Sequence, residues 1–124
     1  MKVTYTRLYA DSSGDSHFKD VEIECHKTDF APPAMPLNVS AFSSAIECGF
    51  ITIPPGWYGD WHPAPQRQFI FHLAGQIESR VSDGETRTFV PGDILLMEDT
   101  TGKGHVSRVV GSAEVLDAVV KLSD

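Results

Sequence analysis

Turn-forming residues interrupt this chain of 124 residues again and again, at intervals of roughly 8 to 12 residues. The segments between the turns are rich in β-branched and aromatic residues and show no sustained helical period. Many short strands separated by such turns indicate an all-β sandwich or barrel. We therefore expect a single all-β domain over residues 1–124. The turns are Asp11–Ser16, Pro54-Pro55-Gly56, Gly75, Asp83-Gly84, Pro91-Gly92-Asp93 and Gly111-Ser112.

Three segments need more than their alternation to be assigned. The three prolines between Phe30 and Leu37 exclude a helix and favour an extended crossing segment. Asp83-Gly84 predicts a two-residue hairpin with a type I′ turn. Residues 115–122 have a spacing that a helix could use, but their valines favour a strand. The expected strands are 3–9, 18–24, 45–53, 68–73, 76–82, 85–90, 94–97, 105–110 and 113–121.

The charge and composition exclude several classes of partner. A formal net charge of −7, with no basic run, argues against binding to nucleic acid or to an anionic membrane. No apolar stretch approaches the roughly 20 residues of a membrane span, and no signal-peptide pattern is present. Cys25 and Cys48 lack metal-binding spacing, so free thiols in a reducing compartment are expected. These observations predict a cytoplasmic protein.

Polar side chains in the segment from Trp57 to Gly75 point to a ligand pocket. The segment opens with a Pro- and Trp-rich loop that carries His62, and then enters a predicted strand. One face of that strand holds Gln68 and His72 among residues that would otherwise fill a barrel interior. A second Gly-rich turn, about thirty residues later, leads to His105. The pattern predicts a small-molecule pocket inside a β-barrel.

Three aromatic residues flank the first histidine of this segment. Trp57, Tyr58 and Trp61 are expected to wall the pocket and bind the substrate, because ligand sites are mostly apolar. The alternative is a hydrophobic lid or a contact between two subunits.

The same segment resembles the first motif of the cupin family, G-x5-H-x-H-x(3,4)-E-x6-G. Gly56, His62, Ala64, Gln68 and Gly75 stand at the motif's five positions, with every spacing kept. The second histidine of the motif is replaced by alanine, and its glutamate by glutamine.

A second cupin motif is similar to the region that ends at His105. Pro91-Gly92-Asp93 resembles its start, and His105 resembles its histidine, with two extra residues between them. Glu98 stands where the motif has proline, and the motif's asparagine is missing. The resemblance spans residues 45–120 and implies a single-domain, cupin-like double-stranded β-helix, or jelly-roll, barrel.

The resemblance implies a metal site at three of these positions. His62, Gln68 and His105 would hold a divalent transition metal such as zinc, nickel, iron or manganese. Glutamine in place of glutamate removes one negative charge, which weakens affinity for a dication and favours an anionic substrate. The same loss is also consistent with a pocket that holds no metal.

Two hypotheses follow for the function. The first is a metal-dependent isomerase, lyase or hydrolase that acts on a small carbonyl or carboxylate compound, with a metal that polarises the carbonyl. In that hypothesis, His72 or Glu98 moves the proton as the catalytic acid or base. The alternatives are a core role for His72, a solvated Glu98, and a non-catalytic barrel that binds or senses a small molecule. Exposed edge strands also favour a homodimer.

Overall fold

All regular elements within residues 2–123 are β-strands, as the sequence pattern predicts. The computed structural model describes residues 2–123. Its strands are β1 (Lys2–Ala10), β2 (Ser16–Glu24), β3 (His26–Thr28), β4 (Leu37–Val39), β5 (Ala45–Ile53), β6 (Tyr58–His62), β7 (Gln68–Ala74), β8 (Gln76–Val81), β9 (Thr86–Phe89), β10 (Ile94–Glu98), β11 (His105–Val110) and β12 (Val115–Leu122).

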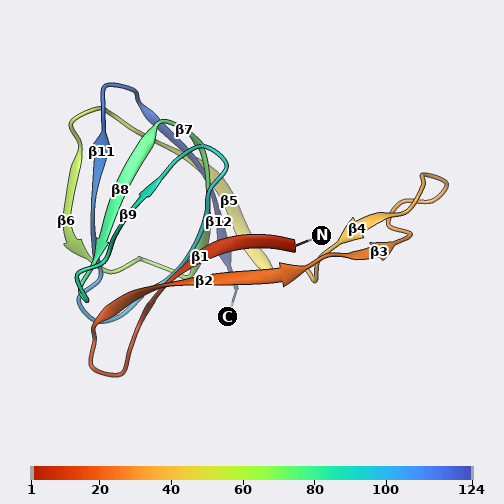
Figure 1. Ribbon diagram of the computed structural model, residues 1–124, viewed down its shortest axis with the longest axis horizontal. Coiled ribbons are helices and arrows are strands. Elements are labelled where there is room, and N and C mark those ends of the chain that lie inside the picture. The colour runs from red at the N-terminus through yellow and green to blue at the C-terminus, as the bar shows by residue number, and fades with distance from the viewer. Residues whose placement is uncertain (1, 124) are drawn as a thin grey trace.

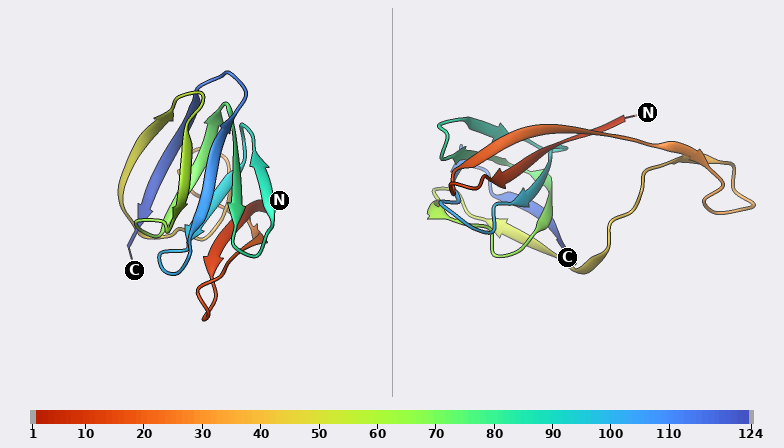
Figure 2. Two further views of the ribbon diagram at one scale, coloured as in Figure 1. Left: turned by 90° about the vertical axis from the view of Figure 1, so that its left-hand side faces the viewer. Right: turned by 90° about the horizontal axis from the view of Figure 1, so that it is seen from below.

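Two sheets face each other and form a barrel (Figure 1). The larger sheet has the strand order β2-β1-β10-β7-β12-β5, and the smaller has the order β6-β11-β8-β9. β1 runs parallel to β10. The pairs after it in this strand order, β10 with β7, β7 with β12 and β12 with β5, are antiparallel. Figure 2 shows the smaller sheet curving over the larger one, which closes the cylinder around its interior.

Alternation along the strands supplies the interior of the barrel. In β7, Gln68, Ile70 and His72 are buried, while Phe69 and Phe71 between them are only half-buried. This places both polar residues on the inward face, as the sequence predicts. Full burial of an aliphatic or aromatic side chain is worth about 1.5–3 kcal/mol. The central core consists of Leu8, Phe18, Ile70, Val81, Phe89, Leu95 and Val119.

Strand β6 was not expected, because the prolines on either side of it suggested a loop over residues 57–65. That prediction is wrong for Tyr58–His62, which pairs with β11. The prolines flank the strand and do not interrupt it, so every residue within it keeps its backbone donor. This pairing brings the loop histidine into the barrel wall.

The Asp83-Gly84 turn also differs from its prediction. Gly84 has a φ of 101°, but no residue other than glycine has positive φ among residues 2–123, so the turn is not of type I′. Gly84 N–H donates to Val81 O at 3.1 Å, and Val81 N–H donates to Glu85 O at 3.0 Å. These bonds are typical of a type I turn followed by a left-handed glycine.

A two-stranded ribbon projects from the barrel where an extended crossing segment was expected. It consists of β3 and β4 and the turn between them (Figure 2, right), and we call residues 26–39 the arm. Exposed apolar residues run from the arm through β5, the edge strand of the larger sheet. They are Phe30, Met35, Leu37, Phe42, Ile46, Phe50 and Ile51, which make up seven of the twelve large exposed hydrophobic residues of the described chain.

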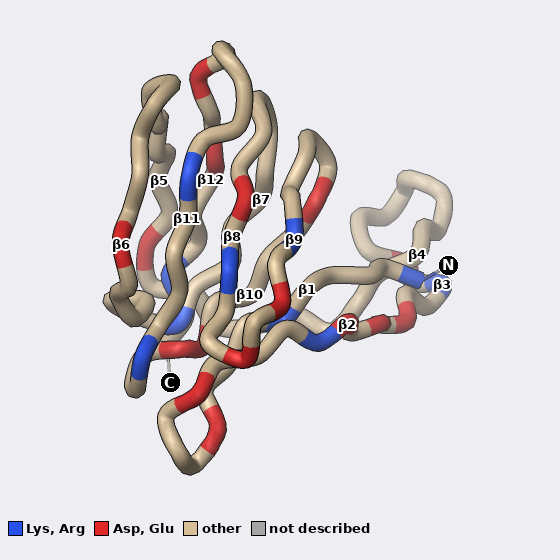
Figure 3. Tube along the Cα trace, turned by 60° about the vertical axis from the view of Figure 1, so that its left-hand side comes forward, with Lys and Arg blue, Asp and Glu red and all other residues tan. Residues whose placement is uncertain are grey.

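Most charged side chains are exposed or half-buried, whereas Asp99 and Asp117 are buried. Figure 3 shows lysines and arginines spread singly over different strands, with acidic residues among them and along β2. Residues 2–123 include no helix with the length and hydropathy that a membrane crossing requires.

A close backbone approach fixes how β6 meets β11. His62 and His105 are register partners at the ends of these strands. Gly104, with a φ of 74°, lies so close to His62 that an added Cβ would come within 2.0 Å of the His62 carbonyl oxygen. Only glycine can occupy this position without moving one strand away from the other.

Substitution of Gly104 by alanine should therefore cost more unfolding free energy than is needed to place an alanine in a left-handed backbone conformation. Gly111 has a similar φ of 82° but open space around it, so Gly111→Ala is the matched control. We expect Gly111→Ala to cost about 1–2 kcal/mol of unfolding free energy. Gly104→Ala should cost about 3–4 kcal/mol, measured by urea denaturation. Equal costs for the two variants would contradict the close approach.

Candidate functional site

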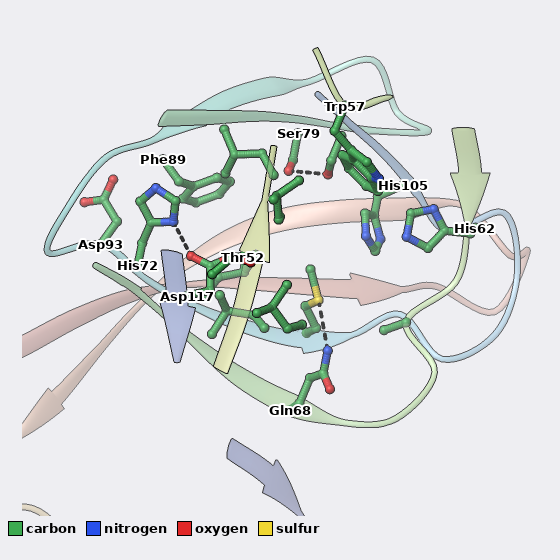
Figure 4. Close-up of a pocket in the computed structure, with 18 of the residues that line it drawn as sticks. Thr52, Trp57, His62, Gln68, His72, Ser79, Phe89, Asp93, His105 and Asp117 are labelled. Atoms are coloured by element: carbon green, nitrogen blue, oxygen red, sulfur yellow. Dashed lines mark hydrogen bonds and ion pairs between the residues drawn. The ribbon is translucent and has the colours of Figure 1, made fainter. Parts of the chain in front are cut away.

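A cavity of about 320 Å³ lies between the two sheets (Figure 4). Its walls are mainly apolar and include Ile51, Ile70, Phe89 and Leu95. A mainly apolar lining with a few convergent polar groups is typical of small-molecule sites. Most polar groups gather at two ends of the cavity, which we call the histidine end and the deep end. The hydroxyls of Ser79 and Ser107 also line the cavity and are bonded to each other at 2.7 Å.

The histidine end is built by His62 of β6 and His105 of β11. Their ring centroids lie 4.5 Å apart, and both residues line the cavity. The Nδ1–H of His62 donates to the Asp60 carbonyl oxygen at 2.6 Å. The Nδ1–H of His105 donates to Asp99 Oδ2, also at 2.6 Å. Because each Nδ1 carries the proton, each neutral ring keeps the lone pair on Nε2.

Asp99 orients His105 and is a site residue that the sequence analysis did not identify. Its side chain is fully buried, and His105 is only 2% exposed. A carboxylate behind a histidine fixes the tautomer and the ring orientation, as it does behind metal-bound imidazoles. Asp99 Oδ1 has no hydrogen-bond partner among the described residues, so the bond to His105 is the one contact found for this carboxylate. The sequence feature that could have identified Asp99 is its position at the start of the Gly-rich turn before His105.

Two of the three predicted metal ligands, His62 and His105, lie next to each other in the wall of the cavity. Imidazole rings 4.5 Å apart are within the reach of one ion with metal–nitrogen distances of about 2.1 Å. Gln68 lines the same cavity, and its Nε2 donates to Met97 Sδ at 3.7 Å. In Figure 4 its carbonyl oxygen is directed away from the two imidazoles, so this oxygen could bind a metal only after the amide group turns over. No group of three or more His, Cys, Asp or Glu side chains within residues 2–123 could hold a metal. A metal here would therefore have two imidazoles and one amide as protein ligands.

The deep end is built by His72 of β7 and Asp117 of β12. Both are buried, and His72 Nδ1 lies 2.5 Å from Asp117 Oδ1. His72 Nε2 lies 3.0 Å from the Gly75 carbonyl oxygen. Burial raises the pKa of the Asp117 carboxyl above its ordinary value, and the nearby His72 opposes this rise. No sequence motif indicates Asp117, because the pair depends on the register between β7 and β12.

The architecture around this cavity matches solved structures of cupins. An RmlC-like cupin family protein with a double-stranded β-helix fold, from Methanocaldococcus jannaschii, is 16% identical over 67% of this chain and 74% of its own, with a TM-score of 0.52. The cupin domain of Schizosaccharomyces pombe Cnp3 is 13% identical over 99% of this chain and 84% of its own, with a TM-score of 0.51. This chain has a cupin fold. The family resemblance in its motifs is thus confirmed at the level of architecture.

A third cupin-fold neighbour is the DMSP lyase DddQ from Ruegeria pomeroyi. It is 22% identical over 82% of this chain and 46% of its own, with a TM-score of 0.53. Likeness at these identities shows a shared fold. No protein-family model matches the sequence, and no curated protein matches it.

The remaining predicted site residues of this cupin-fold chain divide into two groups. Trp57 lines the cavity together with the residues already described. Tyr58, Trp61 and Glu98 are absent from the lining, and Tyr58 and Trp61 are 59% and 44% exposed. Tyr58 and Trp61 lie on β6, where they are mainly directed to solvent.

Glu98 is held by two arginines outside the cavity. Arg7 Nε and Arg67 Nε each donate to one of its carboxylate oxygens. Burial raises the pKa of Glu98, but these two guanidinium groups outweigh burial and bring its pKa below the ordinary value. A carboxylate that stays ionised and paired is poorly suited to proton transfer, so the structure favours a structural role for Glu98.

Glu98→Gln should therefore lower stability in a pH-dependent way. Because the folded-state pKa lies below the ordinary value of 4.5, the carboxylate stabilises the fold above that value. This contribution is lost as the pH falls through the folded-state pKa. We expect the variant to lose about 1–2 kcal/mol at pH 7 and the difference from wild type to shrink towards pH 3.

Urea denaturation across this pH range measures the effect. Glu47→Gln is the control, because Glu47 is exposed and lies 3.4 Å from Lys121 in a surface ion pair, which is worth about 0–1 kcal/mol. A Glu98→Gln variant as stable as wild type at pH 7 would contradict the structural role.

Proposed function

We propose that this protein is a small-molecule enzyme that uses a divalent transition metal to isomerise, cleave or hydrolyse a small carbonyl or carboxylate compound. The observation that carries the proposal is the pair of imidazoles at the histidine end. Both rings face the cavity with their Nδ1 atoms already bonded, so both have an Nε2 lone pair left over for a cation.

In this proposal, each residue at the histidine end of the cavity has a separate role. His62 and His105 would hold the metal, with the Gln68 carbonyl oxygen as the third donor, and the bound metal would supply a Lewis acid that polarises a carbonyl oxygen. Asp99 keeps the proton of His105 on Nδ1 and its Nε2 free. The apolar walls exclude water, which strengthens electrostatic interactions with the substrate.

Charge favours an anionic substrate in this arrangement. The three donors are neutral, and the Asp99 carboxylate behind His105 would compensate only one of the two positive charges of a dication. A carboxylate or enolate oxygen would neutralise part of that charge. The proposed substrate class is therefore a compound with one oxyanion and an otherwise mainly apolar body that fits about 320 Å³.

The second candidate function is a non-catalytic barrel that binds a small molecule. It is favoured by the replacement of two family ligands with Ala64 and Gln68, since Ala64 leaves a buried methyl group where a donor would stand. In this case the two Nε2 lone pairs would accept hydrogen bonds from the ligand.

We also propose that the protein forms a homodimer through the arm and β5. An isolated two-stranded ribbon is marginally stable in water, and a large exposed apolar surface marks a contact site. The exposed apolar residues listed above include three on the arm and three on β5, and the outer edge of β5 also offers unpaired backbone groups.

Metal content distinguishes the two candidate functions. Protein purified without chelator should contain about one equivalent of transition metal, because two imidazoles and an amide meet the minimum of about three protein ligands. His105→Ala should lose this metal. Asp99→Asn should bind it about 10–100-fold more weakly, because the carboxylate no longer fixes the tautomer. Elemental analysis and metal titration measure both effects.

His26→Ala is the matched control for this experiment, because His26 is exposed on β3 and lies outside the cavity. Its metal content should equal that of wild type. Metal-free wild-type protein that still binds small carboxylates would reject the metal-dependent enzyme and favour the binding barrel.

The dimer is tested by light scattering after size-exclusion chromatography. Wild type should have about twice the chain mass. The double variant Met35→Ser/Phe42→Ser should be monomeric, since it removes apolar surface at the first and third most exposed of these residues. Val90→Ser changes an exposed residue outside this surface and should remain dimeric. A monomeric wild type would reject the proposal.

A further inference from the structure

The deep end of the cavity contains a buried acid–imidazole pair that the metal chemistry does not use. His72 lies on β7 and Asp117 lies on the neighbouring strand β12, and both residues line the cavity (Figure 4). Gln68 and His72 are four residues apart on β7, about 13 Å at the rise of a strand. The pair is therefore separate from the histidine end.

Both ring nitrogens of His72 face oxygen atoms. The Gly75 carbonyl can only accept a hydrogen bond, so His72 Nε2 must carry a proton. A lone pair at Nε2 would instead face the lone pairs of that oxygen at 3.0 Å. His72 thus has no free nitrogen with which to take a proton from a ligand.

A single proton then lies between His72 Nδ1 and Asp117 Oδ1. Either Nδ1–H donates to an ionised Asp117, or a protonated Asp117 donates from Oδ1 to Nδ1. The pair has zero net charge in both arrangements. In both of them, Asp117 Oδ2 is an acceptor, as a carboxylate oxygen in the first and as a carbonyl oxygen in the second.

Nothing in the described chain donates to that second oxygen. Asp117 has one side-chain bond, to His72, and it is 6% exposed on the mainly apolar wall of the cavity. The other carboxylate of the lining, Asp93, accepts the Val90 N–H through Oδ2 at 2.8 Å. A buried acceptor in apolar surroundings gains most from a donor that arrives with a ligand.

We infer that Asp117 is a second polar binding site in this cavity, which takes a hydrogen-bond donor, a hydroxyl or an amine, on the apolar part of the ligand. His72 is its positioning residue. The inference deepens the proposed function and rests on it in one respect only, namely that the cavity binds a ligand. Together, the two ends would select a hydroxy- or amino-substituted carbonyl or carboxylate compound.

The test uses probes that need no metal and carry no carboxylate. Toluene, benzyl alcohol and benzylamine share one apolar ring, and only the last two have a donor. Their dissociation constants for the full chain are measured by NMR titration, with the amides of His72 and Asp117 as reporters. Wild type should bind benzyl alcohol and benzylamine at least about tenfold more tightly than toluene, which corresponds to one buried hydrogen bond of about 1.4 kcal/mol.

Two variants separate hydrogen bonding from shape. Asp117→Leu has a similar size and no acceptor, so the preference for benzyl alcohol over toluene should vanish. Asp117→Asn can donate to His72 Nδ1 through its amide group and present its carbonyl oxygen to the cavity, so the preference should be kept within about threefold. Loss of the preference in Asp117→Asn together with its retention in Asp117→Leu would overturn the inference.

The wild-type measurement can still overturn the inference if a variant fails to fold. Equal affinity for toluene and benzyl alcohol, or no binding of any probe at millimolar concentration, would overturn the inference. His105→Ala should keep the preference for donors while it loses metal. A failure of the metal-dependent function is thus seen in the metal content, and a failure of this inference is seen in the probe affinities.

Discussion

The contact between the Gly104 backbone and the His62 carbonyl is the constraint on which the candidate site depends. It lets β6 and β11 meet with no side chain between them, so that two histidines 43 positions apart in the chain become register partners. Separation of the strands by even a methyl group would widen the gap between the rings. The site therefore depends on a residue that carries no functional group.

The cavity combines two kinds of polar chemistry within one apolar enclosure. At the histidine end, the hydrogen bonds to Nδ1 leave lone pairs that suit a cation. At the deep end, both nitrogens of His72 are already occupied, and the free acceptor belongs to Asp117. His72 thus has a different role from His62 and His105 in the same pocket, because its hydrogen-bond partners differ from theirs.

Sequence patterns predicted the strands well where polar and apolar residues alternate. Residues 105–110 form a strand with the predicted bounds, and the segment 115–122 is a strand in spite of its helix-like spacing. Strand β6 could not be predicted, because its pairing with β11 compensates for flanking prolines only in the folded barrel. The histidines were found from motif spacing. Asp117 was missed, because its partner lies 45 residues away and only register brings them together.

The ion pairs of Glu98 have a consequence for the neighbouring residue in the chain. Asp99 follows directly, and it carries the carboxylate that orients His105. Arg7, in the first strand, and Arg67, just before β7, hold the Glu98 side chain and so restrain the backbone next to Asp99. The amino-terminal strand thereby supports the orientation of His105 from a distance, so that loss of Arg7 would loosen the position of this imidazole.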